Sequence, residues 1–294
     1  MRKPIPVTID KKLVSLVMAV SLIGIGVTIF FSFHYATIIL GERAINQLIG
    51  ETAIRGSTIE GIMKSKIQEM QVITTNPMIK MLTAELNPIE DQDILAEAIV
   101  QKRMNYLIEV QAFEASIGGL DDLENVEIIG IDGERLFALV NTKTKKDYLS
   151  DPTFIQGSKE PFTKIILGKD NKRKIVTAAP IFEKPKDTSP IGVAIITANT
   201  NLVDSVLLNR KGLGQTGESY LVDLDGYMVS ESRFVPNAPF TQKVDTAPLE
   251  HCLADGQIYF GSHLDYRGTP VLGASNCLKS FGLSTIVELS LIHI

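Results

Sequence analysis

The sequence has no tryptophan, only two cysteines and only four histidines among its 294 residues. It also lacks any block of basic residues, and its formal net charge is −5. Nucleic-acid binding is therefore not expected, because that function depends on clustered lysine and arginine that neutralise phosphates. The scarcity of histidine and cysteine leaves few metal ligands, and no serine, histidine and aspartate arrangement indicates a hydrolase. We expect no cofactor, no metal and no enzymatic activity in this chain.

Charged residues are also missing from one long stretch near the N-terminus. Between Leu13 and Gly41 there is no Lys, Arg, Asp or Glu, and a helix needs only about 20 apolar residues to cross the hydrocarbon core. This run predicts a transmembrane helix over residues 13–35, after a cytoplasmic tail of residues 1–12. Positive charges precede the run and the first charge after it is Glu42, so the bulk of the chain is expected to be extracytoplasmic at the cell membrane.

A cleavable signal peptide is the alternative interpretation of the same run, since it also begins with positive charge. Its apolar core would span only about 7–15 residues and would end at a small-residue cleavage site. Here the run is longer, ends in the bulky residues FFSFHY and shows no A-x-A pattern before Ala36. The pattern favours an uncleaved membrane anchor.

Helical periodicity continues beyond the apolar run. Apolar residues recur at three- and four-residue steps from Ile45 to Ile73, which predicts an amphipathic stalk helix that ends near Asn76, before Pro77. A second helical stretch is expected over residues 89–113.

We therefore assign residues 36–118 to stalk and packing helices. The stalk either packs only on a domain or also forms a homodimer. Arg55 and Lys66 interrupt the heptad pattern that a dimer would use, so both interpretations stay open.

From Gly118 the pattern changes to short strands separated by turns, which predicts an α+β fold. A helix over 201–211 separates two similar rounds, and a short helix is expected near His251. Strands are expected over residues 125–131, 135–141, 162–167, 175–182 and 191–197, with a loop over 145–161, and then over residues 218–222, 227–232, 257–266, 269–280 and 282–289.

Two short motifs have well-known alternatives that their context does not support. Gly212, Gly214 and Gly217 form a literal G-x-G-x-x-G, but a dinucleotide site needs a strand before it and a helix after it, and here the order is reversed. Loop glycines at positive φ are expected instead. Asp223 and Asp225 begin like a calcium-binding loop, but the later ligand positions are not acidic, so a turn is expected.

Four stretches of the second round resemble the double Cache family, the extracytoplasmic sensor module of chemoreceptors, sensor histidine kinases and diguanylate cyclases. They are GLGQTGESYLV, SESRF, VDTAPLEHCL and LDYRGTPVLGASNCL. The resemblance implies an N-terminal transmembrane helix and long stalk helix followed by two tandem PAS-like antiparallel-sheet modules. The membrane-distal module would span residues 119–208 and usually holds the ligand, and the membrane-proximal module would span residues 209–290.

The resemblance also implies a function: extracytoplasmic small-molecule sensing and transmembrane signal transduction. A membrane-anchored structural or adhesion protein without a ligand switch is the alternative. The family would continue into a second membrane helix and a cytoplasmic output domain. Residues 291–294 do not continue the family pattern, so we expect a truncated or chimeric fragment.

The resemblance places candidate ligand-binding residues between the loop segment and the sheet of the distal module, with a second possible pocket on the proximal strands. Ordinary core packing is the competing interpretation for each of them. The distal candidates are Phe154, Gln156, Ser158, Thr163, Thr177, Ala179 and Thr197, and the proximal candidates are Tyr220, Ser230 and Tyr266.

The ligand itself is expected to be a small molecule, with organic acids, amines and amino acids as the classes to test. Many amino-acid-binding members of the family carry an Arg-x-Trp pair and an acidic residue at the end of the last distal strand. This sequence has no tryptophan and has Thr197 where the acid would fall. The usual mode of amino-acid binding is therefore not expected, because a buried ammonium group without a partner is costly.

The sequence leaves open the roles of Arg233, Arg267 and the two cysteines. The arginines either face a second pocket or brace turns. Cys252 and Cys277 are an even pair in an oxidising compartment, which favours a disulfide. Two buried free thiols, or a metal site with His251 and His263, are the alternatives, but the spacing matches no common zinc pattern.

Overall fold

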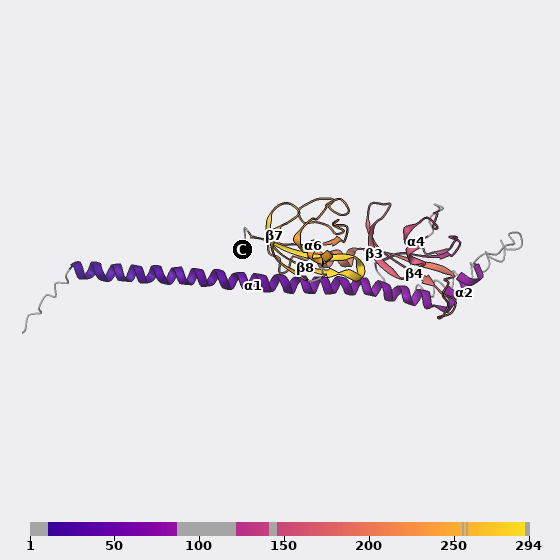
Figure 1. The fold of residues 1–294 in the computed structure, drawn as a ribbon, viewed down its shortest axis with the longest axis horizontal. Coiled ribbons are helices and arrows are strands. Elements are labelled where there is room, and N and C mark those ends of the chain that lie inside the picture. The colour runs from indigo at the N-terminus through magenta and orange to yellow at the C-terminus, as the bar shows by residue number, and fades with distance from the viewer. Residues whose placement is uncertain (1–10, 87–121, 141–145, 255, 257, 292–294) are drawn as a thin grey trace, which may run out of the picture.

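The computed structural model describes residues 11–86, 122–140, 146–254, 256 and 258–291. A long helix, α1 (Lys11–Thr75), runs along the molecule, and two β-sheets lie beside its C-terminal half (Figure 1). The helix predicted over residues 89–113 lies outside the described residues. The apolar part of α1, Val14–Tyr35, has a mean hydropathy of 2.5 and none of it is buried, so by length and composition it can cross a membrane.

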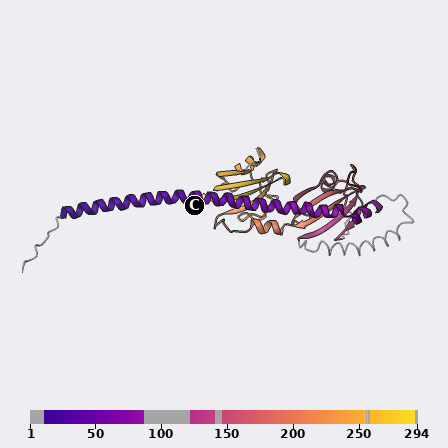
Figure 2. The same cartoon turned by 90° about the horizontal axis from the view of Figure 1, so that it is seen from below.

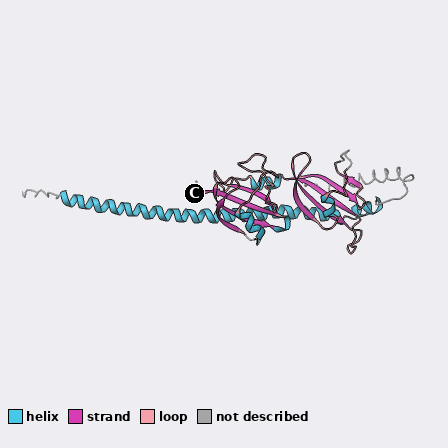
Figure 3. Ribbon diagram, turned by 45° about the horizontal axis from the view of Figure 1, so that its top comes forward, coloured by secondary structure: helices cyan, strands magenta, loops and turns pink. Residues whose placement is uncertain are grey.

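Both sheets are antiparallel, which confirms the predicted α+β class. The first has the strand order β2-β1-β5-β4-β3 and the second β6-β9-β8-β7. The strands are β1 (Leu123–Gly130), β2 (Arg135–Ala138), β3 (Phe162–Leu167), β4 (Arg173–Ile181), β5 (Gly192–Asn199), β6 (Glu218–Asp223), β7 (Tyr259–Leu264), β8 (Pro270–Leu278) and β9 (Leu283–Ser290). Short helices connect or flank them (Figure 3): α2 (Pro77–Leu86), α4 (Pro152–Gly157), α5 (Asn201–Leu207), α6 (Ala247–Ala254) and the 3-10 helix η1 (Lys279–Phe281).

We call β1–β5 with α4 the distal module, because it lies farther along α1 from the apolar segment, and β6–β9 with α6 the proximal module. Helix α5 connects them. In the view from below, α1 passes across both modules (Figure 2). The two sheets fall within the residue ranges that the sequence suggested for the two modules.

Two local predictions were wrong. Residues 227–232 do not form a strand: after the turn at Gly226 they make only isolated bridges, because Met228 N donates to Gln242 O and Tyr227 pairs with Lys243. The predicted loop over 145–161 contains helix α4. Its start is set by Asp151, whose carboxylate accepts the Thr153 N–H at 2.8 Å, and by a proline at the first helical position.

Two other local predictions are confirmed. Helix α1 ends at Thr75 and α2 begins at Pro77, with the Asn76 side chain accepting the Met78 N–H at 2.8 Å. In the G-x-G-x-x-G segment, Gly212 and Gly214 have φ values of 81° and 57°. That segment lies between a helix and a strand, so it has the reverse of the dinucleotide-binding order.

Helix α1 contributes to the core of both modules. Leu48 packs against the proximal sheet, Ile59 and Met63 lie in a cluster that includes residues of both sheets, and Met70 and Ile73 pack against the distal sheet. All five side chains are buried. The apolar face of the stalk helix is therefore covered by the modules of its own chain.

The two cations that interrupt the heptad pattern are also buried against the modules. Arg55 is 4% exposed and donates to backbone carbonyls beyond the end of α5, including Asn209 O at 2.8 Å. Lys66 is 2% exposed and lies 2.9 Å from an oxygen of Asp122, just before β1. These residues anchor α1 to each module, and the homodimer through the stalk stays a prediction.

Gly56 marks the closest approach of α1 to the proximal sheet. A Cβ atom there would lie 2.4 Å from Asn276 Nδ2 and 3.0 Å from Asn276 Cβ, whereas a Cβ at Gly61 would meet nothing within 4 Å. We expect Gly61→Ala to raise the free energy of unfolding by up to about 1 kcal/mol through helix propensity. Gly56→Ala should instead lower it by about 1–2 kcal/mol, since the Asn276 side chain must shift. Chemical denaturation of both variants checks this, and equal effects would contradict the packing.

Candidate functional site

The distal sheet has two differently covered faces, because successive strand residues point to opposite sides. One face carries Ile128, Ala179 and Ile196 and packs against α1 and α2. The opposite face carries Ile129, Val176, Ala178, Val193 and Ile195 and packs under Tyr148 and Phe154. We call this second face the α4 face, because helix α4 covers it.

The predicted distal ligand residues do not share one face. Thr163 and Thr177 join their hydroxyls at 3.0 Å, both are buried, and they lie with Ala179 on the side of α1. They cannot line a pocket under α4, because strand alternation points them the other way. The seven candidates therefore do not share one face of the sheet, and ligand binding by any of them stays a prediction.

The remaining distal candidates lie on or near the α4 face. Phe154 is buried there. Thr197 points to the same side as Ile195, because the two lie two residues apart on one strand and Ile195 is on the α4 face. Ser158 donates to Ile155 O at 3.0 Å and Gln156 is exposed to solvent.

A polar cluster on the α4 face was missed by the sequence analysis. Glu127 lies opposite Ile195 in the β1–β5 register, and its carboxylate accepts the Tyr148 hydroxyl at 2.6 Å. Arg135 lies 3.7 Å from the same carboxylate oxygen. Alternation in the segment ENVEIIG already puts Glu127 and Ile129 on one face, so the position of Glu127 could have been found. Its partners could not, since Tyr148 is 21 residues away.

The hydrogen bonding of this cluster fixes the Glu127 carboxylate as an acceptor. Burial raises the pKa of Tyr148 well above its ordinary value, and the adjacent Glu127 raises it further, so the phenol stays a hydrogen-bond donor. Asp151 is partly buried, which raises its pKa, but Lys146 and the Thr153 N–H outweigh burial and the net shift is downward. Lys146 also lies 4.7 Å from the centre of the Tyr148 ring.

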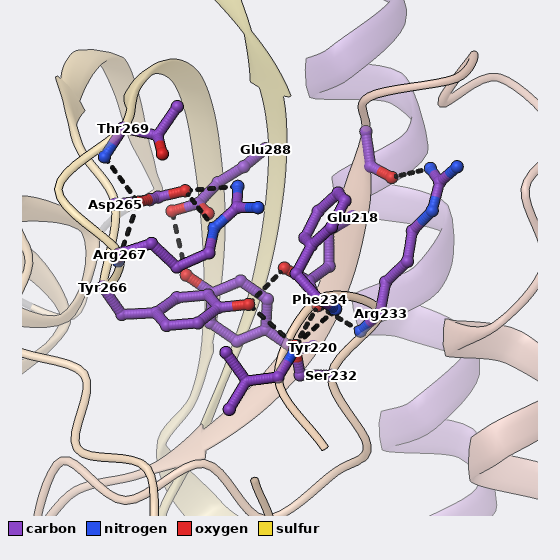
Figure 4. Close-up of polar contacts among 12 residues, drawn as sticks. Glu218, Tyr220, Ser232, Arg233, Phe234, Asp265, Tyr266, Arg267, Thr269 and Glu288 are labelled. Atoms are coloured by element: carbon purple, nitrogen blue, oxygen red, sulfur yellow. Dashed lines mark hydrogen bonds and ion pairs between the residues drawn. The ribbon is translucent and has the colours of Figure 1, made fainter.

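The proximal module holds a second polar network (Figure 4), on the face of its sheet opposite to Leu221, which packs with Ile59 and Met63 of α1. Glu218 is only 3% exposed, and its carboxylate accepts hydrogen bonds from the Ser232 hydroxyl at 2.7 Å, the Arg233 N–H at 2.5 Å and the Tyr266 hydroxyl at 2.7 Å. The network therefore joins β6, the segment after it and the β7–β8 turn.

A second buried carboxylate lies directly across from Glu218. Glu288 is its partner in the β6–β9 register, is 2% exposed, and accepts the Tyr220 hydroxyl at 2.9 Å (Figure 4). His263 Nε2 lies 2.9 Å from the same oxygen. Burial raises the pKa of Glu288, although His263 and Tyr220 partly oppose that shift. Gly273 makes room for this pair, because a Cβ there would lie 2.3 Å from the imidazole.

The proximal candidates Tyr220, Ser230 and Tyr266 are thus engaged in internal hydrogen bonds. Ser230 Oγ accepts the Leu221 N–H at 2.9 Å and is buried. Both open arginines brace turns: Arg233 donates to Gly217 O at 2.6 Å, and Arg267 donates from Nε to Asp265 at 2.9 Å (Figure 4).

The two cysteines meet in the proximal module. Cys252 of α6 and Cys277 of β8 form a disulfide, with their Cα atoms 5.4 Å apart. The bond ties α6 to the outer face of the sheet across a separation of 25 residues. Within the described ranges, no three histidine, cysteine or acidic residues gather closely enough to hold a metal ion.

Comparison with known proteins identifies the fold. The sequence matches no protein-family model and no curated protein sequence. The structure is similar to the ligand-binding domain of the Pseudomonas aeruginosa amino-acid chemoreceptor PctB in complex with L-Arg, with a TM-score of 0.55 and 11% identity, covering 86% of this chain and 97% of that one.

Two further solved structures have the same arrangement. The ligand-binding domain of the Campylobacter jejuni chemoreceptor Tlp3 in complex with L-valine has a TM-score of 0.53 and 14% identity, covering 88% of this chain and 97% of that one. An extracellular domain attributed to a histidine kinase, vpHK1S-Z8, has a TM-score of 0.60 and 13% identity, covering 85% and 94%. This chain therefore has the fold of the ligand-binding domains of chemoreceptors and sensor histidine kinases, the fold that its resemblance to the double Cache family implied.

Proposed function

We propose that this chain is the extracytoplasmic sensor part of a transmembrane receptor and that it binds a small molecule on the α4 face of the distal module. The observation that carries the proposal is the Glu127–Tyr148–Arg135 cluster, a fixed carboxylate on the face where α4 covers the sheet. The fold supports it, because solved proteins of this fold are ligand-binding domains. The chain would sense rather than catalyse.

A ligand with an ammonium group fits this cluster best. The sequence has no carboxylate at position 197, and Glu127 supplies one close to that position. Thr197 on β5 pairs with Asn125 on β1, and Glu127 lies two residues after Asn125 on the same face. The contact with Arg135, at 3.7 Å, is long for an ion pair, so the Glu127 carboxylate can still compensate the burial of a ligand's positive charge. Amines and amino acids are therefore the first classes to test, and the solved relatives include complexes with L-Arg, L-valine and GABA.

The signal would pass through α1. Since this helix packs against both modules and continues into the apolar segment Val14–Tyr35, a shift of one module against α1 moves the segment that we place in the membrane. Binding would favour the packing that the ligand prefers.

A thermal-shift screen of the full chain in detergent tests the proposal with amines, amino acids and organic acids. We expect at least one ammonium compound to raise the melting temperature, since a ligand at 100 times its dissociation constant stabilises by about 2.7 kcal/mol. Glu127→Gln should weaken that ligand at least about tenfold, because a charged hydrogen bond contributes about 1.5–3 kcal/mol.

The matched control is Glu134→Gln, which removes an exposed carboxylate from the β1–β2 turn of the same hairpin. It should leave the shift unchanged. A folded protein that no compound stabilises, or one whose ligand is indifferent to Glu127→Gln, would contradict the proposal and favour a membrane-anchored structural protein.

A further inference from the structure

A polar cleft with a volume of about 540 Å³ lies between the two modules. One wall is formed by the β3–β4 turn with Asn171 and by the start of α5 with Asn201, and the facing wall includes Asn237 from the segment after β6. Small-molecule sites typically enclose about 300–1,000 Å³ and often lie between domains. None of the residues assigned to the α4 face lines this cleft.

The partly buried charged side chains of the cleft pair with one another, whereas Lys172, which also lines it, is exposed and forms no ion pair within the described residues. Arg173 is 9% exposed and forms two parallel hydrogen bonds to Asp204, at 2.8 and 3.0 Å, and a third contact to Glu231 at 3.1 Å. Glu124 pairs with Lys174 at 3.1 Å. A ligand with a net charge would lose hydration without gaining an unpaired counter-charge among these paired groups, and the exposed Lys172 ammonium is screened by water, so a charged ligand is disfavoured.

Of the four asparagine side chains that line the cleft, only that of Asn199 is engaged within the described residues, through Asp122 O and the Asn201 N–H. In the described part of the chain, the side-chain amides of Asn171, Asn201 and Asn237 make no hydrogen bond. Each amide supplies two donors and one acceptor, and the paired carboxylates keep further acceptor sites. Hydroxyl groups both donate and accept, so they can satisfy amides and carboxylates together without adding charge.

The geometry points to this cleft as a second binding site, for a neutral polyhydroxylated compound such as a polyol or a monosaccharide. The ligand contacts Asn171 of the distal module and Asn237 of the proximal module at the same time. Its binding therefore favours one orientation of the modules, the orientation in which Arg173 joins β4 to Glu231. This site is independent of the proposed ligand on the α4 face.

Isothermal titration calorimetry on the full chain in detergent tests the site, with sorbitol, myo-inositol and glucose as probes. Asn171→Gly and Asn237→Gly remove one amide each. Both residues have left-handed backbones, with φ values of 62° and 55°, and glycine adopts that conformation without strain. The substitutions should therefore leave the fold intact and remove only the hydrogen bonds.

We expect at least one probe to bind, each single variant to weaken it about five- to tenfold, and the double variant to weaken it further. Glu127→Gln, on the α4 face, should leave this binding within twofold of the unsubstituted chain. The assignment is overturned if no probe binds at millimolar concentration, or if both asparagine variants bind as tightly as the unsubstituted chain. It is also overturned if the charged compounds succinate or putrescine bind with the same dependence on Asn171 and Asn237.

Discussion

Replacing Arg55 by alanine should lower the free energy of unfolding by about 3–5 kcal/mol, which is among the largest effects expected for a single substitution. Its guanidinium donates to Val206 O at the end of α5, to Asn209 O at 2.8 Å and to Lys211 O at 3.1 Å. Carbonyls at a helix C-terminus carry partial negative charge and have no partners within the helix. Removing the cation leaves these partly buried carbonyls without their donor, and it removes the polar contact between α1 and the segment that leads from α5 into the proximal module.

Chemical denaturation followed by circular dichroism measures this loss, with hydrogen exchange to locate it at α5 and β6. Arg43→Ala is the control, because Arg43 lies on the same helix and is exposed, so its effect should be close to zero. Arg55→Lys should recover only part of the loss, since an ammonium group cannot reproduce the planar array of donors. A loss below 1 kcal/mol for Arg55→Ala would show that α1 is held by apolar packing alone.

Replacing His263 by alanine should produce a loss of stability that depends on pH. At pH 7.5 it leaves the buried Glu288 carboxylate without its imidazole hydrogen-bond partner at 2.9 Å, and leaving a buried polar group unsatisfied costs about 1–3 kcal/mol, more when the group is charged. Burial already raises the pKa of Glu288, and His263 opposes that shift. Without the imidazole, the pKa of Glu288 in the folded protein should rise further.

The sign of the pH dependence follows from this raised pKa. A carboxyl group that binds its proton more readily in the folded protein contributes stability below its ordinary pKa, and that contribution is lost as pH rises through the folded value. The loss in His263→Ala should therefore be smaller at pH 5 than at pH 7.5. Glu288→Gln combined with His263→Ala should recover stability at pH 7.5, since no charge then remains to be buried.

Denaturation curves at the two pH values check this expectation. His251→Ala is the matched control: His251 is exposed, and its ring lies 5.0 Å from the ring of Tyr259, which also contacts His263 at 5.5 Å. It should change stability by less than about 0.5 kcal/mol at either pH. An equal loss at both pH values in His263→Ala would mean that the histidine contributes packing rather than charge.

The local signals in the sequence were reliable where a short segment decides its own structure. The end of the stalk helix at Thr75 follows from the missing N–H of Pro77, and the strand β3 over Phe162–Leu167 follows from its alternation between turns. The strand predicted over 227–232 is reduced to isolated bridges: Val229 N still donates to Leu221 O of β6, but Met228 N donates to Gln242 O, and nothing within the segment specifies that second pairing. Helix α4 was missed although Asp151 and the following proline are an ordinary start signal.

The candidate site could be predicted only in part. Resemblance and strand alternation were enough to place Phe154 and Thr197 on the α4 face. They did not place Thr163, Thr177 and Ala179 correctly, because a strand pattern does not say which of its two faces meets the stalk helix. Which helix covers which face of the sheet depends on contacts between segments that are distant in the sequence.

By itself, the sequence determined the apolar segment, the long helix beyond it, most strands and the class of fold, because each depends on the period of residues within a short window. Only the tertiary structure decided that Arg55 and Lys66 anchor the stalk helix, that Tyr148 reaches Glu127, and that an amide-lined cleft separates the modules. Arg55 and Asn209, for example, are 154 positions apart. Contacts of that range depend on how the completed modules pack, and no local pattern in the chain encodes them.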